Sequence, residues 1–213
     1  MGYFQIGAQG TPTPPQPTFP ASVLAKMAFR GDYKRGEFQE FGFKTKAFYI
    51  DPAYPNILLE RGEGGKPVLT ADGWLFDRNA QSFLSISDIS NVVEMWAVAR
   101  SLDNGTFADL SMIMSVAGDY YAYGSSGDNN IDFSTNGIAN INNVNNYNFA
   151  PLDTFKTVAF EIPTGFSNGN IGAYQSNQYF WNGYVKDVLC FSTALTSTER
   201  TALQAYLAGY HNF

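Results

Sequence analysis

The end of the chain constrains the fold most. Residues 184–191 place apolar, aromatic and β-branched side chains on both alternating faces, and only Lys186 and Asp187 interrupt the run. A half-buried strand would instead alternate apolar with polar side chains. The pattern therefore predicts a strand that is covered on both of its faces.

A capped helix is expected directly after this strand. Thr196 occupies an N-cap position, and Glu199, three residues later, can accept a hydrogen bond from the Thr196 backbone N–H, which is the capping-box pattern. The apolar residues of 202–207 recur at helical spacing on one face. Gly209 stands where a left-handed residue would close the helix. The chain is thus predicted to end in a strand, a short turn and a capped helix.

The composition indicates one β-rich domain. The chain has 213 residues, enough for a single sizeable β domain with its own core. It contains 18 Phe, 13 Tyr and 3 Trp but only 15% charged residues, a balance that fits pleated sheets better than helices. The net charge of -6 argues against a surface that neutralises phosphates, so no nucleic-acid partner is expected. No apolar segment is long enough to span a bilayer, so no membrane partner is expected.

The closing segment resembles that of the concanavalin A-like lectin/glucanase superfamily, in particular of its LamG-like jelly-roll domains. In those domains the last core strand follows a Gly and leads into a short helix with a Leu-Thr-x-x-Glu-Arg start and a Tyr-Leu pair. The matching residues here are Gly183, Val185, Val188, Leu195, Thr196, Glu199, Arg200, Tyr206 and Leu207. Upstream, residues 48–51 look like the opening strand of such a domain, and residues 65–69 to 83–86 like the segment that wraps onto it.

The resemblance implies an all-β fold and a division of the chain into three regions. The fold would be a two-sheet antiparallel jelly-roll β-sandwich, concanavalin A-like, with a short C-terminal helix and an extended N-terminal arm. Residues 1–22 would form the arm, residues 23–47 a connecting or first-strand region, and residues 48–213 the LamG-like sandwich. The family name implies a fold and not a function.

The arm is rich in proline. Residues 7–20 contain five prolines and no charge, which predicts an extended, polyproline-like conformation. One interpretation is a tether that docks on a partner surface, and the other is a disordered tail. The docking residues of the tether would be Tyr3, Phe4, Ile6 and Phe19.

Catalytic chemistry has few candidates in this sequence. His211 is the only histidine and Cys190 the only cysteine, which leaves a zinc site without its usual ligands and a catalytic triad dependent on one histidine near the C-terminus. Cys190 lies in an apolar run and is expected to be a small buried residue without a disulfide. Glu94, beside Trp96, lacks the second acid that glycoside hydrolysis needs, so it is expected to be a satisfied or edge-facing acid. We therefore expect no catalytic residue and no enzymatic activity.

Two pairs of tyrosines are candidates for stacking against sugar rings. They are Tyr120 with Tyr123, and Tyr147 with Tyr174. Tyr147 lies in the stretch 129–148, in which nine of twenty residues are Asn. That stretch is either a polar rim that faces carbohydrate or a turn-rich loop, since loops are commonly rich in Asn.

Calcium is the one cofactor for which the sequence offers candidate ligands. Asp128, Asn130 and Asp132 lie close together and supply the oxygen atoms that calcium prefers. No EF-hand loop with a Glu at its twelfth position surrounds them, and acidic loops are usually only solvated. Apart from this possible calcium ion, no cofactor is expected.

Taken together, these features indicate a bacteriophage virion protein. The LamG-like domain, the arm, and an N-terminus without the basic start and apolar block of a secretion signal predict synthesis in the host cytoplasm and display on the virion as a capsid decoration, head fibre or tail fibre. Other virion proteins would bind the arm, and a lectin-like surface would bind cell-surface or mucus glycans. A homo-oligomer is expected, because fibres and spikes are commonly trimeric. The alternatives are a stand-alone carbohydrate-binding module and, less favoured because of the missing acid pair, an endoglycanase.

Overall fold

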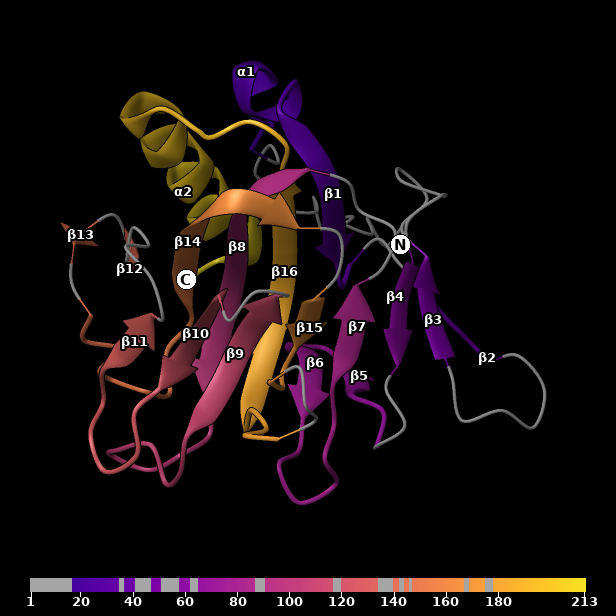
Figure 1. The fold of residues 1–213 in the computed structure, drawn as a ribbon, viewed down its shortest axis with the longest axis vertical. Helices are drawn as coiled ribbons and strands as arrows, with labels where there is room; N and C mark the ends of the chain where they lie inside the picture. The colour runs from indigo at the N-terminus through magenta and orange to yellow at the C-terminus, as the bar shows by residue number, and fades with distance from the viewer. Residues whose placement is uncertain are drawn as a thin grey trace, which may run out of the picture.

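The computed structural model contains two antiparallel β-sheets and a C-terminal helix (Figure 1). Helix α2 (Ser197–His211) follows the last strand, and the short helix α1 (Ala21–Leu24) precedes the first. The structure describes residues 17–34, 37–40, 47–50, 58–61, 65–86, 91–116, 120–133, 140–141, 144–145, 147–166, 169–174 and 178–213.

The first sheet has six strands, and the strand expected from the end of the sequence lies inside it. The strands are β1 (Met27–Asp32), β5 (Val68–Thr70), β6 (Gly73–Phe76), β8 (Val92–Ser101), β14 (Lys156–Phe166) and β16 (Gly183–Phe191). Their order is β14, β8, β16, β6, β5. One edge of β16 pairs with β8, and the other edge pairs first with β6 and then with β1.

The second sheet has eight strands. They are β2 (Glu37–Glu40), β3 (Ala47–Ile50), β4 (Leu58–Arg61), β7 (Leu84–Ile86), β9 (Ser111–Val116), β10 (Tyr120–Gly124), β11 (Ile131–Phe133) and β15 (Gly169–Ile171). Their order is β11, β10, β9, β15, β7, β4, β3, β2. A separate pair is formed by β12 (Asn140–Ile141) and β13 (Val144–Asn145). Two antiparallel sheets that enclose a core confirm the all-β prediction at the level of a β-sandwich.

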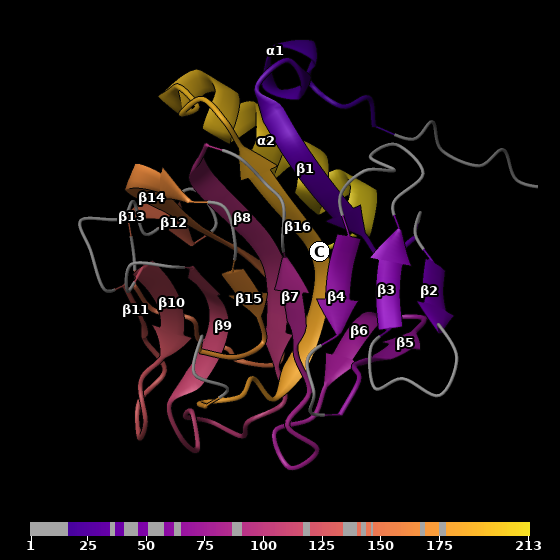
Figure 2. The same cartoon turned by 45° about the vertical axis from the view of Figure 1, so that its right-hand side comes forward.

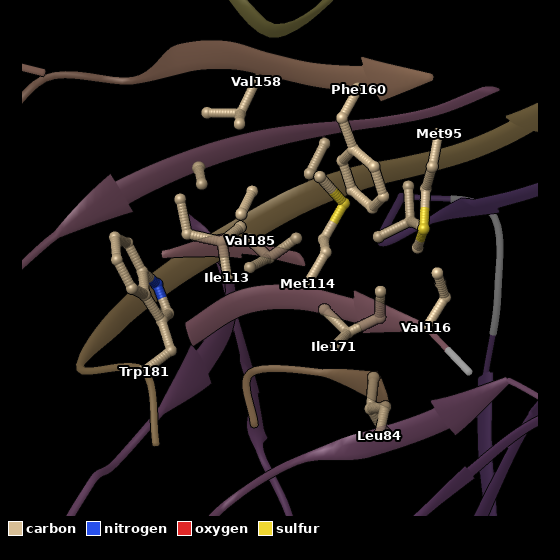
Figure 3. Packing of buried hydrophobic residues seen from close by; sticks show 14 of the residues in the cluster. Leu84, Met95, Ile113, Met114, Val116, Val158, Phe160, Ile171, Trp181 and Val185 are labelled. Carbon is tan, nitrogen blue, oxygen red and sulfur yellow. The ribbon is translucent and has the colours of Figure 1, made fainter. Parts of the chain in front are cut away.

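The main hydrophobic core lies between the two sheets (Figure 3). Met95, Phe160 and Val185 project into it from the first sheet, and Met114 and Ile171 project from the second. All five side chains are almost or fully inaccessible to solvent. Close packing of apolar groups from both sheets is the main stabilising contribution in such an architecture.

Strand β16 is covered on both faces, as its sequence predicts. Val188 and Cys190 belong to the core between the sheets, whereas Leu189 and Phe191 pack in a second apolar cluster with side chains of α2. Helix α2 lies on the side of the first sheet that faces away from the second sheet (Figure 1, Figure 2). The helix therefore supplies the second cover that makes the continuous apolar pattern possible.

The beginning of α2 confirms the predicted capping box, but its end does not follow the prediction. The Thr196 side chain accepts a hydrogen bond from the Glu199 backbone N–H, and the Glu199 carboxylate accepts one from the Thr196 backbone N–H. The prediction that Gly209 closes the helix is wrong, because the helix continues to His211 and Asn212 takes the left-handed conformation with φ of 56°. Asn tolerates that conformation better than other residues with a Cβ, so it can terminate a helix in place of Gly.

The N-terminal part of the described chain joins the first sheet. Residues 27–32 form β1 and pair with β16. Phe19 packs edge-on against Tyr206 of α2, with the ring centroids 4.7 Å apart. Residues 1–16 lie outside the described part of the chain. No helix of the described part combines the length and the apolar character that crossing a membrane requires.

Candidate functional site

A pocket lined by tyrosines opens on the outer face of the second sheet. It has a volume of about 380 Å³, within the range of pockets that hold small ligands. The residues that line it come from the start of β9, from β10, and from the turn after β15: Leu110, Met112, Tyr121, Tyr123, Tyr174, Gln178 and Tyr179. Two consecutive strands and a third segment further along the chain therefore build one cavity.

The strand register explains why β9 and β10 present these side chains. Tyr121 and Tyr123 flank Ala122, which is fully buried in the core, so alternation along β10 turns both tyrosines outward. In β9 the pairing skips Ile113, since Ala122 pairs with Met114 and Tyr123 with Met112. Because of this bulge, Ile113 and Met114 both lie in the core, and Met112 lines the pocket.

Backbone hydrogen bonds hold Tyr174 and Tyr179 in place. The Met112 N–H donates to the Tyr179 carbonyl over 2.8 Å, and the Tyr174 N–H donates to the Gln178 carbonyl over 2.9 Å. Tyr179 has φ of 56°, a left-handed conformation that is unfavourable for a residue with a Cβ. Strained residues of this kind cluster at ligand sites, where the surrounding structure holds them in place.

The four rings meet at steep angles. Ring centroids are 5.4 Å apart for Tyr121 and Tyr123, 5.7 Å for Tyr121 and Tyr174, and 6.2 Å for Tyr174 and Tyr179. The corresponding interplanar angles are 66°, 81° and 56°. Tyr179 is 42% exposed, so the pocket opens to solvent past this ring. Mutually inclined rings support one another through edge-to-face contacts and form a preorganised aromatic wall.

The pocket carries no positive charge of its own. No Lys, Arg or His is among its described lining residues. Burial raises the pKa of Tyr123, and the neighbouring Asp132 carboxylate, which accepts a hydrogen bond from the tyrosine, raises it further. Tyr123 therefore remains a neutral hydroxyl at physiological pH, and the nearest acids give this part of the surface a negative potential.

The structure brings together only part of the predicted tyrosine set. Tyr123 and Tyr174 both line the pocket. Tyr147 is 53% exposed but contacts Phe133, with ring centroids 6.2 Å apart, and it does not line the pocket. The side chain of Tyr120 lies outside the described part of the structure.

Sequence reasoning missed Tyr121 and Tyr179. Tyr120 and Tyr123 are three positions apart, so a regular strand would turn them to opposite faces, whereas Tyr121 and Tyr123 are two positions apart and share a face. This alternation was available in the sequence and would have identified Tyr121. No local signal identifies Tyr179, because its place depends on its hydrogen bond to Met112 in β9, which is distant in sequence.

The predicted calcium ligands are engaged with one another and with neighbouring groups. Both carboxylate oxygens of Asp128 accept hydrogen bonds from Asn130, one from its backbone N–H at 2.8 Å and one from its side-chain amide at 3.4 Å. Asp132 accepts a hydrogen bond from the Ser125 hydroxyl at 2.7 Å. These bonds form a tight polar turn next to the pocket, and the calcium assignment of Asp128, Asn130 and Asp132 stays a prediction.

A second acidic cluster is buried between β1, β16 and α2. Asp32, Asp187 and His211 place their ligand atoms within 4.8 Å of one another. Arg30 already bonds Asp187 at 2.6 Å and lies 3.3 Å from Asp32. Burial alone would raise the pKa of Asp187, but Arg30 and His211 hold it below its usual value. Arg30 pairs with both carboxylates, so this cluster is best explained as an ion-pair network that joins β1 and β16 to the end of α2.

Two residues that were considered as catalytic candidates are buried in the folded protein. Glu94 is buried and accepts hydrogen bonds from the Trp96 indole, the Leu195 backbone N–H and the Arg200 guanidinium, which confirms the prediction of a satisfied acid. Cys190 is buried in the core and unpaired, as expected, and burial raises the pKa of its thiol. Neither side chain is available to a ligand.

The residues predicted for the docking arm divide into two groups. Tyr3, Phe4 and Ile6 lie outside the described part of the chain. Phe19 is half-buried between α2 and Arg30, whose guanidinium carbon lies 5.3 Å from the ring centroid. In this structure Phe19 contacts the body of its own chain.

Comparison of the chain with known proteins adds no relative. No family model, no curated protein and no solved structure matches it.

Proposed function

We propose that this protein is a non-enzymatic, lectin-like module that binds glycans in the tyrosine-lined pocket. The observation that carries the proposal is the open cavity of about 380 Å³ walled by four tyrosines. A cavity of this size accommodates one or two sugar units, and aromatic rings provide the apolar surface on which the C–H face of a sugar packs. The Tyr hydroxyls and the Gln178 amide supply hydrogen-bonding groups at the same site.

The absence of enzymatic activity belongs to the same proposal. Glu94 supports it, because the residue is buried and fully engaged with Arg200, Trp96 and the Leu195 backbone. None of the described residues that line the pocket is a carboxylic acid, whereas glycoside hydrolysis uses two. A lectin retains a sugar without needing either of these two carboxylic acids.

The experiment that tests the proposal is incubation of the full-length protein with a broad glycan panel, with and without calcium. Retention and released product are both read. We expect retention without product, and Tyr174→Leu should weaken retention about tenfold because it removes one wall of the pocket. Tyr147→Leu is the matched control, since Tyr147 is an exposed tyrosine outside the pocket. Released product, or equal retention by the two variants, would contradict the proposal.

We further propose that the β-sandwich is a LamG-like jelly roll displayed on a bacteriophage particle as a capsid decoration or fibre. This part is supported by the resemblance of the closing strand and helix and by the proline-rich residues 1–22. Display through that region brings a glycan-binding pocket to the surface of a host cell or to mucus. An experimental structure tests the jelly-roll connectivity, and removal of residues 1–16 tests the attachment. Equal occupancy of particles by the full-length and shortened chains would contradict attachment through this segment.

A further inference from the structure

The pocket lies in the acidic part of the chain. Between Arg100 and Lys186 the sequence has one basic residue, Lys156, and it has seven acidic residues: Asp103, Asp109, Asp119, Asp128, Asp132, Asp153 and Glu161. The ammonium group of Lys156 is held elsewhere, bonded to the Thr154 hydroxyl at 2.5 Å and 4.9 Å above the Phe149 ring. Arg78 also lies beside the pocket, where it donates to the Ser111 hydroxyl and the Phe180 carbonyl, but its charge is paired with Asp103 at 2.9 Å. The remaining charges of this part of the chain are mostly acidic, and such surroundings favour cations over carboxylates.

The arrangement of the rings restricts the shape of the group that fits best. A flat sugar face stacks on one ring plane, whereas neighbouring rings here are inclined by 56° to 81°. Rings inclined in this way can surround a compact, nearly spherical group and can offer their negative π faces from several directions. Recognition of methylated ammonium groups by aromatic cages uses this arrangement.

Other features of the pocket suit a cation that cannot donate hydrogen bonds. Leu110 and Met112 add apolar surface, which methyl groups require. The Asp132 carboxylate is near enough to Tyr123 to raise the pKa of its hydroxyl, so a negative charge lies close to this ring. No guanidinium or ammonium group lies among the described lining residues to oppose a bound cation.

We propose that the pocket recognises a methylated ammonium group, such as the trimethylammonium group of choline, carried as a substituent on a surface glycan. The inference rests on the proposed function, since a glycan is taken to carry the ammonium group. The cavity is larger than the ammonium group alone and leaves room for the sugar to which the group is attached. Tyr121, Tyr123, Tyr174 and Tyr179 form the cage, and Asp132 supplies the compensating charge. The negative potential of the surrounding acidic residues excludes sugars that carry carboxylates.

The test compares choline with its neutral isostere, in which a carbon atom replaces the nitrogen. The two molecules have the same shape, so isothermal titration calorimetry of the full-length protein with each isolates the contribution of the charge. We expect choline to bind at least about tenfold more tightly than the isostere. Equal affinity for the two would overturn the inference.

Variants of one cage residue separate the π face from the hydroxyl group. Tyr121→Phe keeps the ring and should bind choline within about threefold of the natural protein, whereas Tyr121→Leu should lose about tenfold or more. Tyr147→Leu, outside the pocket, should leave choline affinity unchanged. A Tyr121→Leu protein that binds choline normally overturns the cage. If that variant does not fold, Tyr179→Leu at the 42% exposed position replaces it in the same comparison.

The glycan panel of the previous section distinguishes this inference from the proposed function. Retention of neutral glycans together with no preference for choline over its isostere leaves the glycan-binding function standing and overturns the methylated-ammonium inference. Choline binding without retention of any glycan supports the cage and overturns glycan binding. If the protein retains no glycan and does not bind choline, both proposals are overturned.

Discussion

Buried acids in this protein are matched by arginines at the contact between α2 and the first sheet. Glu94 on β8 meets Arg200 of α2 at 2.9 Å, and Asp187 on β16 meets Arg30 of β1 at 2.6 Å. Each of these carboxylates is paired with a guanidinium and accepts further hydrogen bonds, which offsets the cost of its burial. Their role is to fix the helix in one position on the sheet, which apolar contacts alone specify less strictly.

Replacing Glu94 by Gln should therefore destabilise the protein. The change leaves Arg200, whose side chain is 11% exposed, without its buried anion, and we expect the free energy of unfolding to fall by about 3 kcal/mol. Urea denaturation followed by fluorescence measures the loss. Glu161→Gln is the control, because Glu161 also pairs with Arg200 but is 37% exposed, and its loss should stay below about 1 kcal/mol. Equal losses would show that burial of the pair is not what matters.

Lys156 should make the stability rise with pH in the alkaline range. Burial lowers its pKa from 10.5 to about 8. Between these two values the unfolded chain holds a proton that the folded chain has released, so Lys156 makes the free energy of unfolding increase with pH. Burial raises the pKa of the Cys190 thiol, which opposes this increase once the unfolded thiol ionises, so the contribution of Lys156 is the difference between the natural protein and Lys156→Met. Urea denaturation at several pH values between them measures the slope. Lys156→Met removes the titrating group, and a slope that persists in this variant would assign the effect to other residues.

At the scale of elements, the length of α2 decides how the C-terminus meets the sheet. The helix must continue past Gly209 for His211 to reach Asp187, with its Nε2 2.9 Å from the carboxylate. Local sequence favours a stop at Gly209, since glycine is the commonest left-handed residue. The bond to Asp187 and the tolerance of Asn212 for a left-handed conformation allow two more residues of helix before it ends.

Gly209→Ala should stabilise the protein. Gly209 lies inside the helix and is exposed, and an added Cβ would meet only Pro17, at an ordinary contact distance of 3.6 Å. Alanine in a helix is favoured over glycine by about 0.5–1 kcal/mol, and the free energy of unfolding should rise by that amount. Thermal and urea denaturation both measure it. A loss of about 1 kcal/mol would instead place Gly209 in a left-handed conformation.

Asn212 provides the matched position for this comparison. Asn212→Ala should lower the free energy of unfolding by about 1 kcal/mol, because alanine is strained at φ of 56°. Asn212→Gly relieves that strain and should be close to neutral. The opposite signs expected for alanine at positions 209 and 212 locate the end of the helix without further structural work.

At the scale of the whole molecule, local patterns predicted elements better than they predicted the site. The doubly apolar run of β16 and the capping box of α2 are signals contained within a few residues, and both elements formed as expected. The pocket depends on a bulge at Ile113 in the pairing of β9 with β10, and on the hydrogen bond that joins Tyr179 to Met112 from a distant part of the chain. Sequence patterns alone predicted Tyr123 and Tyr174 as binding residues but could not predict that four tyrosines meet in one pocket.

The contact of Phe19 with α2 makes this part of the N-terminus important for the stability of the β-sandwich. The Phe19 ring packs 4.7 Å from Tyr206 and 5.3 Å from Arg30, so it belongs energetically to the sandwich. Adding Phe19→Ala to a chain that lacks residues 1–16 should lower the free energy of unfolding by about 1–2 kcal/mol relative to the shortened chain alone. Urea denaturation of the two proteins measures this difference.

The same pair of proteins separates stability from attachment. If residues 1–16 carry the proposed tether, both shortened chains fail to occupy particles, although only the Phe19→Ala chain is less stable. If Phe19 itself were the docking residue, the chain lacking residues 1–16 would still attach and the Phe19→Ala substitution would abolish attachment. Because Phe19 is half-buried against its own helix, we expect the first result. Quantifying each chain on purified particles, with unfolding measured in parallel, decides between the two.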